Sequence, residues 1–424
     1  MKNTIFVILC LFCLRSGTAQ PLASLSLSTA YEKANTNYPL LKNGQLLQEQ
    51  TDLKLENLDR SRLPNVLWKA DASLQSETVQ FPGDGQVPIQ IDLPLYKLKT
   101  YAEAQYLIYD GGLNEAKQDL EKLKSAADQQ ALQVDMYPLR EQVNRYFFGV
   151  LLLREQIKLL EVTLNDLATK KETLEAAVRH GAMLESEVDK LTVRQLEIEA
   201  EKEQSQSGIS ALLAMLGKLT ATDLPDDVEL LLPDLNGFHL NQNLSRPEQT
   251  LFQLKKQALL GNENLIEAAQ KPKLSAFAQA GLGYPNPLNF FDNSLSPYAM
   301  GGLSFSWKLF DWGKDDRDRE MLAIQSQIID NQRETFEFNL NLLEGKYRED
   351  LAKLENLIER DQEITALQGK ILKQLSSQLE HGVITVNDYL SQVNAELKSR
   401  QKLRLHEVQL QQVKVDYLTK RGAL

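Results

Sequence analysis

A glycine-centred motif that occurs twice at a fixed spacing constrains this chain more than any other feature. Residues 179–183 read Arg-His-Gly-Ala-Met and residues 380–384 read Glu-His-Gly-Val-Ile, each between two long segments of helical character. The glycines are 201 residues apart (382 − 181), and the aspartates of two aromatic-Asp-x-Gly steps, Asp110 and Asp311, keep this offset (311 − 110). Equal spacing of two markers indicates an internal duplication, in which each glycine turn ends a helical hairpin.

The first 19 residues are typical of a secretory signal peptide. Lys2 precedes an apolar run over residues 4–14, and small residues follow at 17–19. Cys10 and Cys13 lie inside this segment, so cleavage would leave no thiol for a disulfide, a metal site or a nucleophile. The formal net charge of −11 argues against a nucleic-acid partner. No later apolar run approaches the roughly 20 residues of a membrane helix, so a membrane-embedded part would consist of strands.

Four segments alternate between apolar and polar residues, as strands do. They cover residues 65–76, 100–110, 273–282 and 302–311, and Pro-, Gly- and Asn-rich loops at 77–99 and 283–297 join them in pairs. The first places Val66, Trp68, Ala70, Ala72 and Leu74 on one face. Such ten-residue strands are expected of a membrane barrel. A soluble two-stranded hairpin on a core would show the same pattern, but the symmetry of the two halves favours the barrel.

Long helices account for most of the remaining chain. Ser26 is expected to cap a first helix, and the Ser-x-x-Glu spacing of residues 245–248 predicts the start of its counterpart. Apolar residues at heptad spacing on both sides of the first glycine turn predict coiled-coil packing. Pro138 should kink or break the first long helix, whereas the equivalent residue in the second half is Asn339.

These patterns divide the chain into a signal peptide (1–19), two repeats and a linker. The first repeat covers 20–217, with strands at about 65–110 and a helical hairpin at 112–217. The linker covers 218–244. The second repeat covers 245–424, with strands at about 273–311 and a hairpin at 313–420. Four strands cannot close a barrel, and an open edge is not viable in lipid, so several chains would have to share one barrel.

With these motifs in this order, the sequence resembles the TolC family of outer-membrane efflux proteins. The resemblance is carried by residues 25–40, 245–248, 109–112 and 310–313, and by the glycine turns followed by Val188 and by residues 388–390. It implies a mainly α fold with a membrane β-barrel contribution. Each chain would add four strands to a 12-strand barrel in a homotrimer, above a long coiled-coil α-helical barrel with an equatorial region at the linker.

The resemblance also implies a function. The chain would form the exit duct of a tripartite efflux pump or a type I secretion system, in the outer membrane of a Gram-negative cell and extending into the periplasm. Its partners would be a periplasmic adaptor, an inner-membrane pump of the RND, ABC or MFS type, and outer-membrane lipid. No enzymatic activity and no cofactor are implied. A periplasmic adaptor or a structural coiled-coil protein is the alternative, although adaptors carry a single hairpin.

The resemblance places the pore constriction just after the glycine turns. Glu187 and Asp388 each lie six residues after a turn glycine and match the family's aperture acids, although solvated acids on a coiled-coil face are the ordinary alternative. The positions of the family's gate arginine and second acid are occupied by Ile384 and Ser391, so a charge-locked closure of the family's type is in doubt.

The turns themselves are expected to contact the adaptor. This tip comprises Arg179, His180, Gly181, Ala182, Met183, Glu380, His381, Gly382 and Val383. The two histidines are either helix C-terminal cations or a pH-sensitive contact. Tyr106, Trp307 and Trp68 are candidates for membrane-interface aromatics, or else for a soluble core. No metal site is expected, because no pair among His180, His239, His381 and His406 has ligand spacing on one helix.

Overall fold

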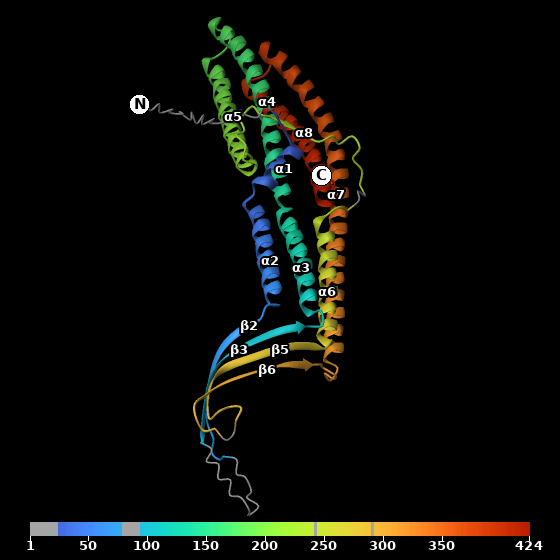
Figure 1. Cartoon of the computed structure of the whole chain (residues 1–424). Coiled ribbons are helices and arrows are strands. Elements are labelled where there is room, and N and C mark those ends of the chain that lie inside the picture. Colours follow the sequence, from blue (N-terminus) through green and yellow to red (C-terminus); the bar gives the residue numbers. More distant parts are fainter. Residues whose placement is uncertain (1–23, 79–93, 241–243, 290–291) are drawn as a thin grey trace, which may run out of the picture. The chain divides into compact units, whose positions relative to one another are not determined.

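The computed structural model describes residues 24–78, 94–240, 244–289 and 292–424 (Figure 1). The predicted signal peptide lies outside these residues. The chain forms two compact units, and each combines segments from both halves of the sequence. Unit 1 contains the chain up to Leu41 together with Asp135–Arg246 and Phe338–Leu424. Unit 2 contains Lys42–Val134 and Pro247–Glu337. Because each unit draws on both halves of the sequence, the units do not test the repeat boundaries at 217 and 245, which remain a prediction.

Unit 1 is built from two helical hairpins and the start of the described chain. Its elements are β1 (Ser24–Ser26), α1 (Leu27–Asn37), η1 (Pro39–Leu41), α4 (Leu139–Arg179), α5 (Glu185–Thr220), β4 (Glu229–Leu231), the C-terminal part of α7 (Lys314–Glu380) and α8 (Val386–Arg421). The predicted cap of α1 is confirmed, because the Thr29 amide donates to Ser26 Oγ at 3.1 Å. The short strands β1 and β4 pair in parallel, which places part of the predicted irregular linker in a sheet.

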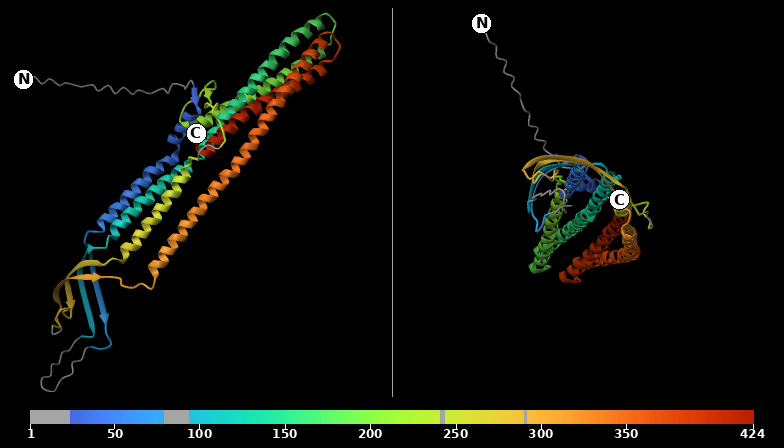
Figure 2. Two further views of the ribbon diagram at one scale, coloured as in Figure 1. Left: turned by 90° about the vertical axis from the view of Figure 1, so that its right-hand side faces the viewer. Right: turned by 60° about the horizontal axis from the view of Figure 1, so that its bottom comes forward.

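The heptad pattern forms the interior of the hairpins. Leu160, Leu167 and Leu174 of α4 are buried at seven-residue intervals and pack in one cluster with Leu191 and Ile198 of α5. The predicted break at Pro138 is confirmed, because α3 (Leu113–Met136) ends just before it and α4 begins just after it. In the second half, α7 runs through the equivalent position without interruption for 67 residues. Figure 2 shows the α4–α5 and α7–α8 turns at the same end of unit 1.

Unit 2 contains one four-stranded antiparallel sheet and the helices that adjoin it in sequence. Its elements are α2 (Lys42–Arg60), β2 (Asn65–Leu74), β3 (Tyr96–Tyr109), α3, α6 (Pro247–Gln270), β5 (Lys273–Tyr284), β6 (Ser296–Ser306) and the N-terminal part of α7. The strand order is β2-β3-β5-β6, and the sheet is strongly curved (Figure 1). The two predicted strand pairs are therefore joined through β3 and β5, which pair from Leu98↔Tyr284 to Tyr109↔Leu274 with an irregularity after Leu107.

The register separates the sheet into an apolar and a polar face. Directly paired residues share a face, and one row consists of Trp68, Ala102, Ala280 and Ala299. The neighbouring row on the other face contains Lys69, Tyr101, Gly281 and Tyr298. The predicted alternation is therefore confirmed. The apolar face is exposed, with Trp68 at 74% and Leu303 at 69% of full exposure. It is not the covered face of a soluble core.

One strand prediction was wrong in position. The fourth strand was expected at residues 302–311, but β6 spans Ser296–Ser306, and its last ladder pair is Lys273↔Ser306. The strand was placed too far along the chain because Trp307 and Leu309 continue the apolar alternation beyond the end of the sheet, where both are exposed. Across the described ranges, no helix combines the length and the apolar character needed to cross a membrane.

Candidate functional site at the helical hairpin tips

Both glycine turns have the same backbone structure. At the end of α4, Gly181 has φ +74°, its amide donates to Val178 O at 2.9 Å, and the Ala182 amide donates to Ala177 O at 2.9 Å. Gly382 has φ +66°, and the Val383 amide donates to Gln378 O at 2.9 Å in the same pattern. This is the Schellman motif that ends helices, and it needs a residue that tolerates a positive φ. Because a Cβ on either glycine would meet open space, the glycines are required for backbone conformation alone.

The helices that follow the turns start differently. In α8, Thr385 forms a capping box with Asp388: the Asp388 amide donates to Thr385 Oγ1 at 3.3 Å, and the Thr385 amide donates to Asp388 Oδ2 at 3.1 Å. In α5 the equivalent N-cap residue is Leu184, which has no hydroxyl and makes no side-chain cap. The two repeats therefore have the same backbone structure where the first helix of each hairpin ends. They differ in the N-cap of the second helix of each hairpin.

The two predicted pore acids are each bonded within their own helix. The hydrogen bond from the Thr385 hydroxyl, together with the Thr385 amide, lowers the pKa of Asp388. Glu187 accepts from Lys190 Nζ at 2.8 Å, three residues further along α5. Within the described residues, neither carboxylate is bonded to the other hairpin. Asp388 thus has a local structural role that its match to the family did not predict.

Ile384 and Ser391 differ in their environments. Ile384 is half-buried and packs against the buried cluster that contains Leu379, Val386 and Tyr389. Its counterpart in the first repeat, Met183, packs against the same cluster. Both tips are therefore brought together by one apolar core, and the position of the family's arginine is here an apolar packing position. Ser391 is exposed on α8.

An ion pair that joins the two hairpins near their tips was not predicted from the sequence. Lys170 of α4 donates to Glu380 Oε1 of α7 at 2.6 Å and to Ser376 O at 3.4 Å, and its ammonium lies 5.7 Å from the centre of the Tyr389 ring of α8. The side chain of Lys170 is only 8% exposed. The hydrogen bond from Lys170 lowers the pKa of Glu380, and burial raises the pKa of Tyr389 to about 12.

The predicted adaptor-contacting residues lie on the surface. Arg179, His180, Ala182, Glu380 and Val383 are exposed, as are His381 and the two glycines, whereas Met183 is half-buried. His381 Nδ1 lies 2.8 Å from Ser377 O in the last turn of α7, which is the local, helix-ending arrangement. No group of three or more His, Cys, Asp or Glu side chains that could hold a metal ion occurs in the part of the chain that the structure describes.

The predicted interface aromatics belong to unit 2, whereas the hairpin tips belong to unit 1. Trp68 and Tyr106 are exposed on the apolar face of the sheet, and Trp307 follows β6 and donates from Nε1 to Gln270 O at 3.1 Å. Sequence reasoning missed Phe310 and Trp312, whose rings meet edge to face at 4.9 Å and are both exposed. The sequence did contain a signal for this pair, because both residues belong to the second aromatic-Asp-x-Gly step.

Two helical hairpins joined to a four-stranded antiparallel sheet give this chain the fold of TolC-type outer-membrane channels. CusC, whose crystal structures describe folding and transmembrane channel formation, matches 94% of this chain over 93% of its own, with 15% identity and a TM-score of 0.64. The outer-membrane channel OprN matches 93% of this chain over 89% of its own, with 15% identity and a TM-score of 0.60. The Campylobacter jejuni outer-membrane channel CmeC matches 93% over 85%, with 15% identity and a TM-score of 0.57. No protein-family model and no curated protein matches the sequence.

Proposed function

We propose that this chain is the subunit of an outer-membrane channel that serves as the exit duct of a tripartite efflux pump or a type I secretion system. The observation that carries the proposal is the sheet of unit 2, whose exposed face contains no charged side chain while its other face is polar. Strands of this kind suit a wall between lipid and water. The likeness over more than nine-tenths of the chain to solved channels supports this function over an adaptor or a structural coiled-coil protein.

The open edges of the sheet support a shared barrel. β2 and β6 are the edge strands within the chain, and an unpaired edge in lipid would leave backbone amides and carbonyls without partners. Pairing of β6 with β2 of a second copy would satisfy both edges, and three copies would close twelve strands. The homotrimer would lie in the outer membrane of a Gram-negative cell after cleavage of residues 1–19, with outer-membrane lipid around the sheet and the helices in the periplasm.

The hairpin tips would form the periplasmic mouth. We assign the exposed residues of both glycine turns to the adaptor contact, and the adaptor would join the channel to an inner-membrane pump of the RND, ABC or MFS type. Glu187, Asp388, Ile384 and Ser391 would lie near the constriction. The channel would be a passive conduit, with neither a cofactor nor a covalent step of its own.

We further assign closure of the tip to the ion pair between Lys170 and Glu380. It links α4 of the first hairpin to α7 of the second, and the buried lysine has the Tyr389 ring beside it. Replacing Lys170 removes this link between α4 and α7 and leaves Glu380, whose side chain is 46% exposed, without its partner. The two hairpins of one chain should then separate more easily at the tip.

Single-channel conductance in planar bilayers tests both assignments. Purified wild-type protein should form channels of low conductance, and Lys170→Met should raise that conductance. Acidification should also raise the conductance of the wild-type channel. Because Lys170 lowers the pKa of Glu380, the stabilisation from the pair is present above the carboxylate's ordinary value of 4.5 and is lost as the pH falls below it. Wild-type conductance should therefore rise only below about pH 4.5, and that of Lys170→Met should change less.

Lys158→Met is the matched control. Lys158 makes an ion pair of the same length, 2.6 Å, but with Glu155 of its own helix. Its removal should leave the conductance unchanged. Equal conductance of Lys170→Met and wild type would reject the closing role of the ion pair, whereas a wild-type protein that never forms channels would reject the proposed function itself.

A further inference from the structure

The polar face of the sheet has the opposite charge balance from the whole chain. The full sequence has 47 Lys and Arg against 58 Asp and Glu. The ladder register places the following charged residues on the polar face: Lys69, Asp71, Lys97, Lys99, Glu103 and Lys273. The polar face therefore contains four lysines and two carboxylates. In the trimeric barrel of the proposed function this face lines the lumen, and the excess of positive charge is tripled.

Ion pairing leaves two of these lysines without a carboxylate partner among the described residues: Lys97 at the loop end of the strands and Lys273 at the opposite end. Glu103, whose side chain is only 5% exposed, accepts from Lys69 Nζ at 2.9 Å and from Gln279 Nε2 at 2.8 Å, so it neutralises Lys69 in mid-sheet. Asp71 lies 3.3 Å from Lys99. Lys97 is paired in register with Ser73, but its side chain is exposed and makes no ion pair or hydrogen bond to any residue in the described ranges. Within the described part of β2 and β3, the lysine without a carboxylate partner is therefore Lys97.

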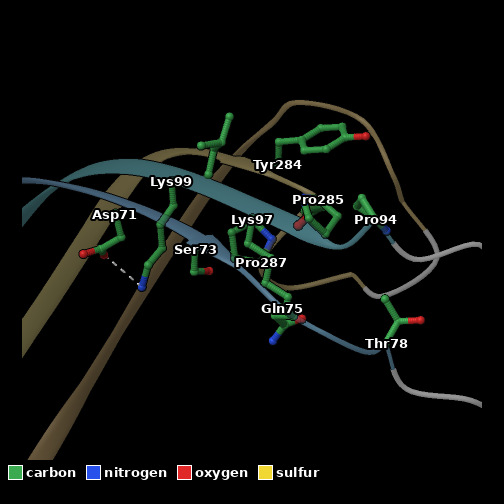
Figure 3. A pocket seen from close by; sticks show the side chains of 12 residues that line it. Asp71, Ser73, Gln75, Thr78, Pro94, Lys97, Lys99, Tyr284, Pro285 and Pro287 are labelled. Carbon is green, nitrogen blue, oxygen red and sulfur yellow. Dashed lines mark ion pairs between the residues drawn. The ribbon is translucent and has the colours of Figure 1, made fainter.

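Lys97 and Lys99 line a hollow at this end of the sheet (Figure 3). Its volume is about 430 Å³, and the hydroxyl and amide groups of Ser73 and Gln75 lie beside the lysines. The Asp71 carboxylate also lines the hollow, where it is paired with Lys99. Prolines form the apolar part of its lining: Pro94, Pro285 and Pro287. Lysine ammonium groups bind carboxylates, sulfonates and phosphates as point charges, and proline rings offer an apolar surface to the rest of a ligand.

We propose that this hollow is a binding station for organic anions that leave through the channel. A negatively charged head group pairs with Lys97, beside the ion pair of Lys99 with Asp71, and an apolar body rests on the proline rings. Three such hollows around one lumen raise the local concentration of anions and disfavour cations at the outer end of the barrel, because a low-dielectric wall focuses the field of like charges. This inference rests on the proposed function, since it needs the polar face to line a pore.

Lys97 is the residue to vary, because its substitution breaks no ion pair or side-chain hydrogen bond among the described residues. The series Lys97→Arg, Lys97→Gln and Lys97→Glu should be reconstituted in planar bilayers under a potassium chloride gradient. The reversal potential should show potassium permeability, relative to chloride, rising in the order Arg, Gln, Glu, by about twofold or more from Arg to Glu, because three copies change together. Lys97→Arg keeps the charge and should match wild type. Block by 1-naphthalenesulfonate should weaken severalfold in the Gln and Glu variants only.

The outcomes separate this inference from the function beneath it. Channels with the same reversal potential and the same block in all variants would overturn the anion station and leave the channel assignment intact. Absence of any channel in wild type would instead reject the proposed function. Since single substitutions at an exposed, unpaired lysine leave the fold unchanged, channel formation by each variant also serves as its folding control.

Discussion

Trp312 has a backbone conformation that bulky residues rarely adopt. Its φ is +59°, and it stands 201 residues after Gly111 (312 − 111), whose φ is +74°. The second repeat therefore keeps the left-handed turn of the first but fills it with a tryptophan that is 81% exposed. A left-handed conformation costs a residue with a Cβ roughly 1–2 kcal/mol. The aromatic ring is retained at an energetic cost, which fits a role on the surface.

Trp312→Gly should therefore stabilise the protein. Glycine relieves the left-handed strain, and after allowance for its greater freedom in the unfolded chain we expect a net gain of up to about 1 kcal/mol. Thermal unfolding in detergent measures it. Phe310→Gly is the control, because it removes the neighbouring exposed ring from a residue without a positive φ and should lower the melting temperature. Equal losses in both variants would contradict the strain argument.

The aspartate before each of these turns explains why the aromatic-Asp-x-Gly step recurs. Asp110 accepts from the amides of Gly112 at 2.9 Å and Asn114 at 2.7 Å. Asp311 accepts from Gly313 at 3.0 Å and Asp315 at 2.9 Å, and the Asp315 amide is the main cause that lowers the pKa of Asp311 to about 2. Each carboxylate satisfies free amides at the start of a helix. The step is a strand-to-helix turn, and the sequence predicted its position but not its hydrogen bonds.

Glycines within the helices of unit 1 have different packing roles. A Cβ on Gly217, near the end of α5, would lie 2.7 Å from the carbonyl oxygen of Thr222, which belongs to the backbone and cannot rotate away. A Cβ on Gly345, in α7, would meet nothing within 4 Å. The first glycine is required by close approach of the chain, whereas the second only weakens its helix.

The same substitution at these two positions should have opposite effects. Gly345→Ala should stabilise the helix by about 0.8–1 kcal/mol, the difference in helix propensity. Gly217→Ala should destabilise the protein despite the same gain in propensity, because the backbone after α5 has to shift. Melting temperatures of the two variants against wild type check this pair. A rise in both would show that the end of α5 relaxes freely.

Elements with a strong internal period were predictable, and those defined by distant partners were not. The burial of the heptad leucines of α4, such as Leu160 and Leu167, was predictable because the coiled-coil seam repeats every seven residues. β1 and β4 have three residues each, too few for a pattern. At the tips, Glu187 and Asp388 could be located by spacing. Lys170 could not, because its partner Glu380 lies 210 residues further along the chain.

At the scale of the whole molecule, the proposed assembly follows from the two faces of the sheet and from its two free edges. A monomer would expose both the apolar face and the backbone of β2 and β6. Native mass spectrometry from detergent should therefore detect three chains per particle. Dissociation should yield unfolded or aggregated chains rather than a stable monomer, because edge strands of this kind pair with any strand available. A stable folded monomer in detergent would contradict the shared barrel.

The pairing of β3 with β5 also determines when the sheet can form. Leu98 lies beside Tyr284 and Tyr109 beside Leu274, so the first hairpin, the linker and α6 all intervene in sequence. Contacts of such high sequence separation form late, whereas the two ends of a helical hairpin meet quickly. Separate two-stranded hairpins are marginal in water. We therefore expect the continuous apolar surface to be assembled last during folding, after the helices, which shortens the time for which it is exposed to other chains.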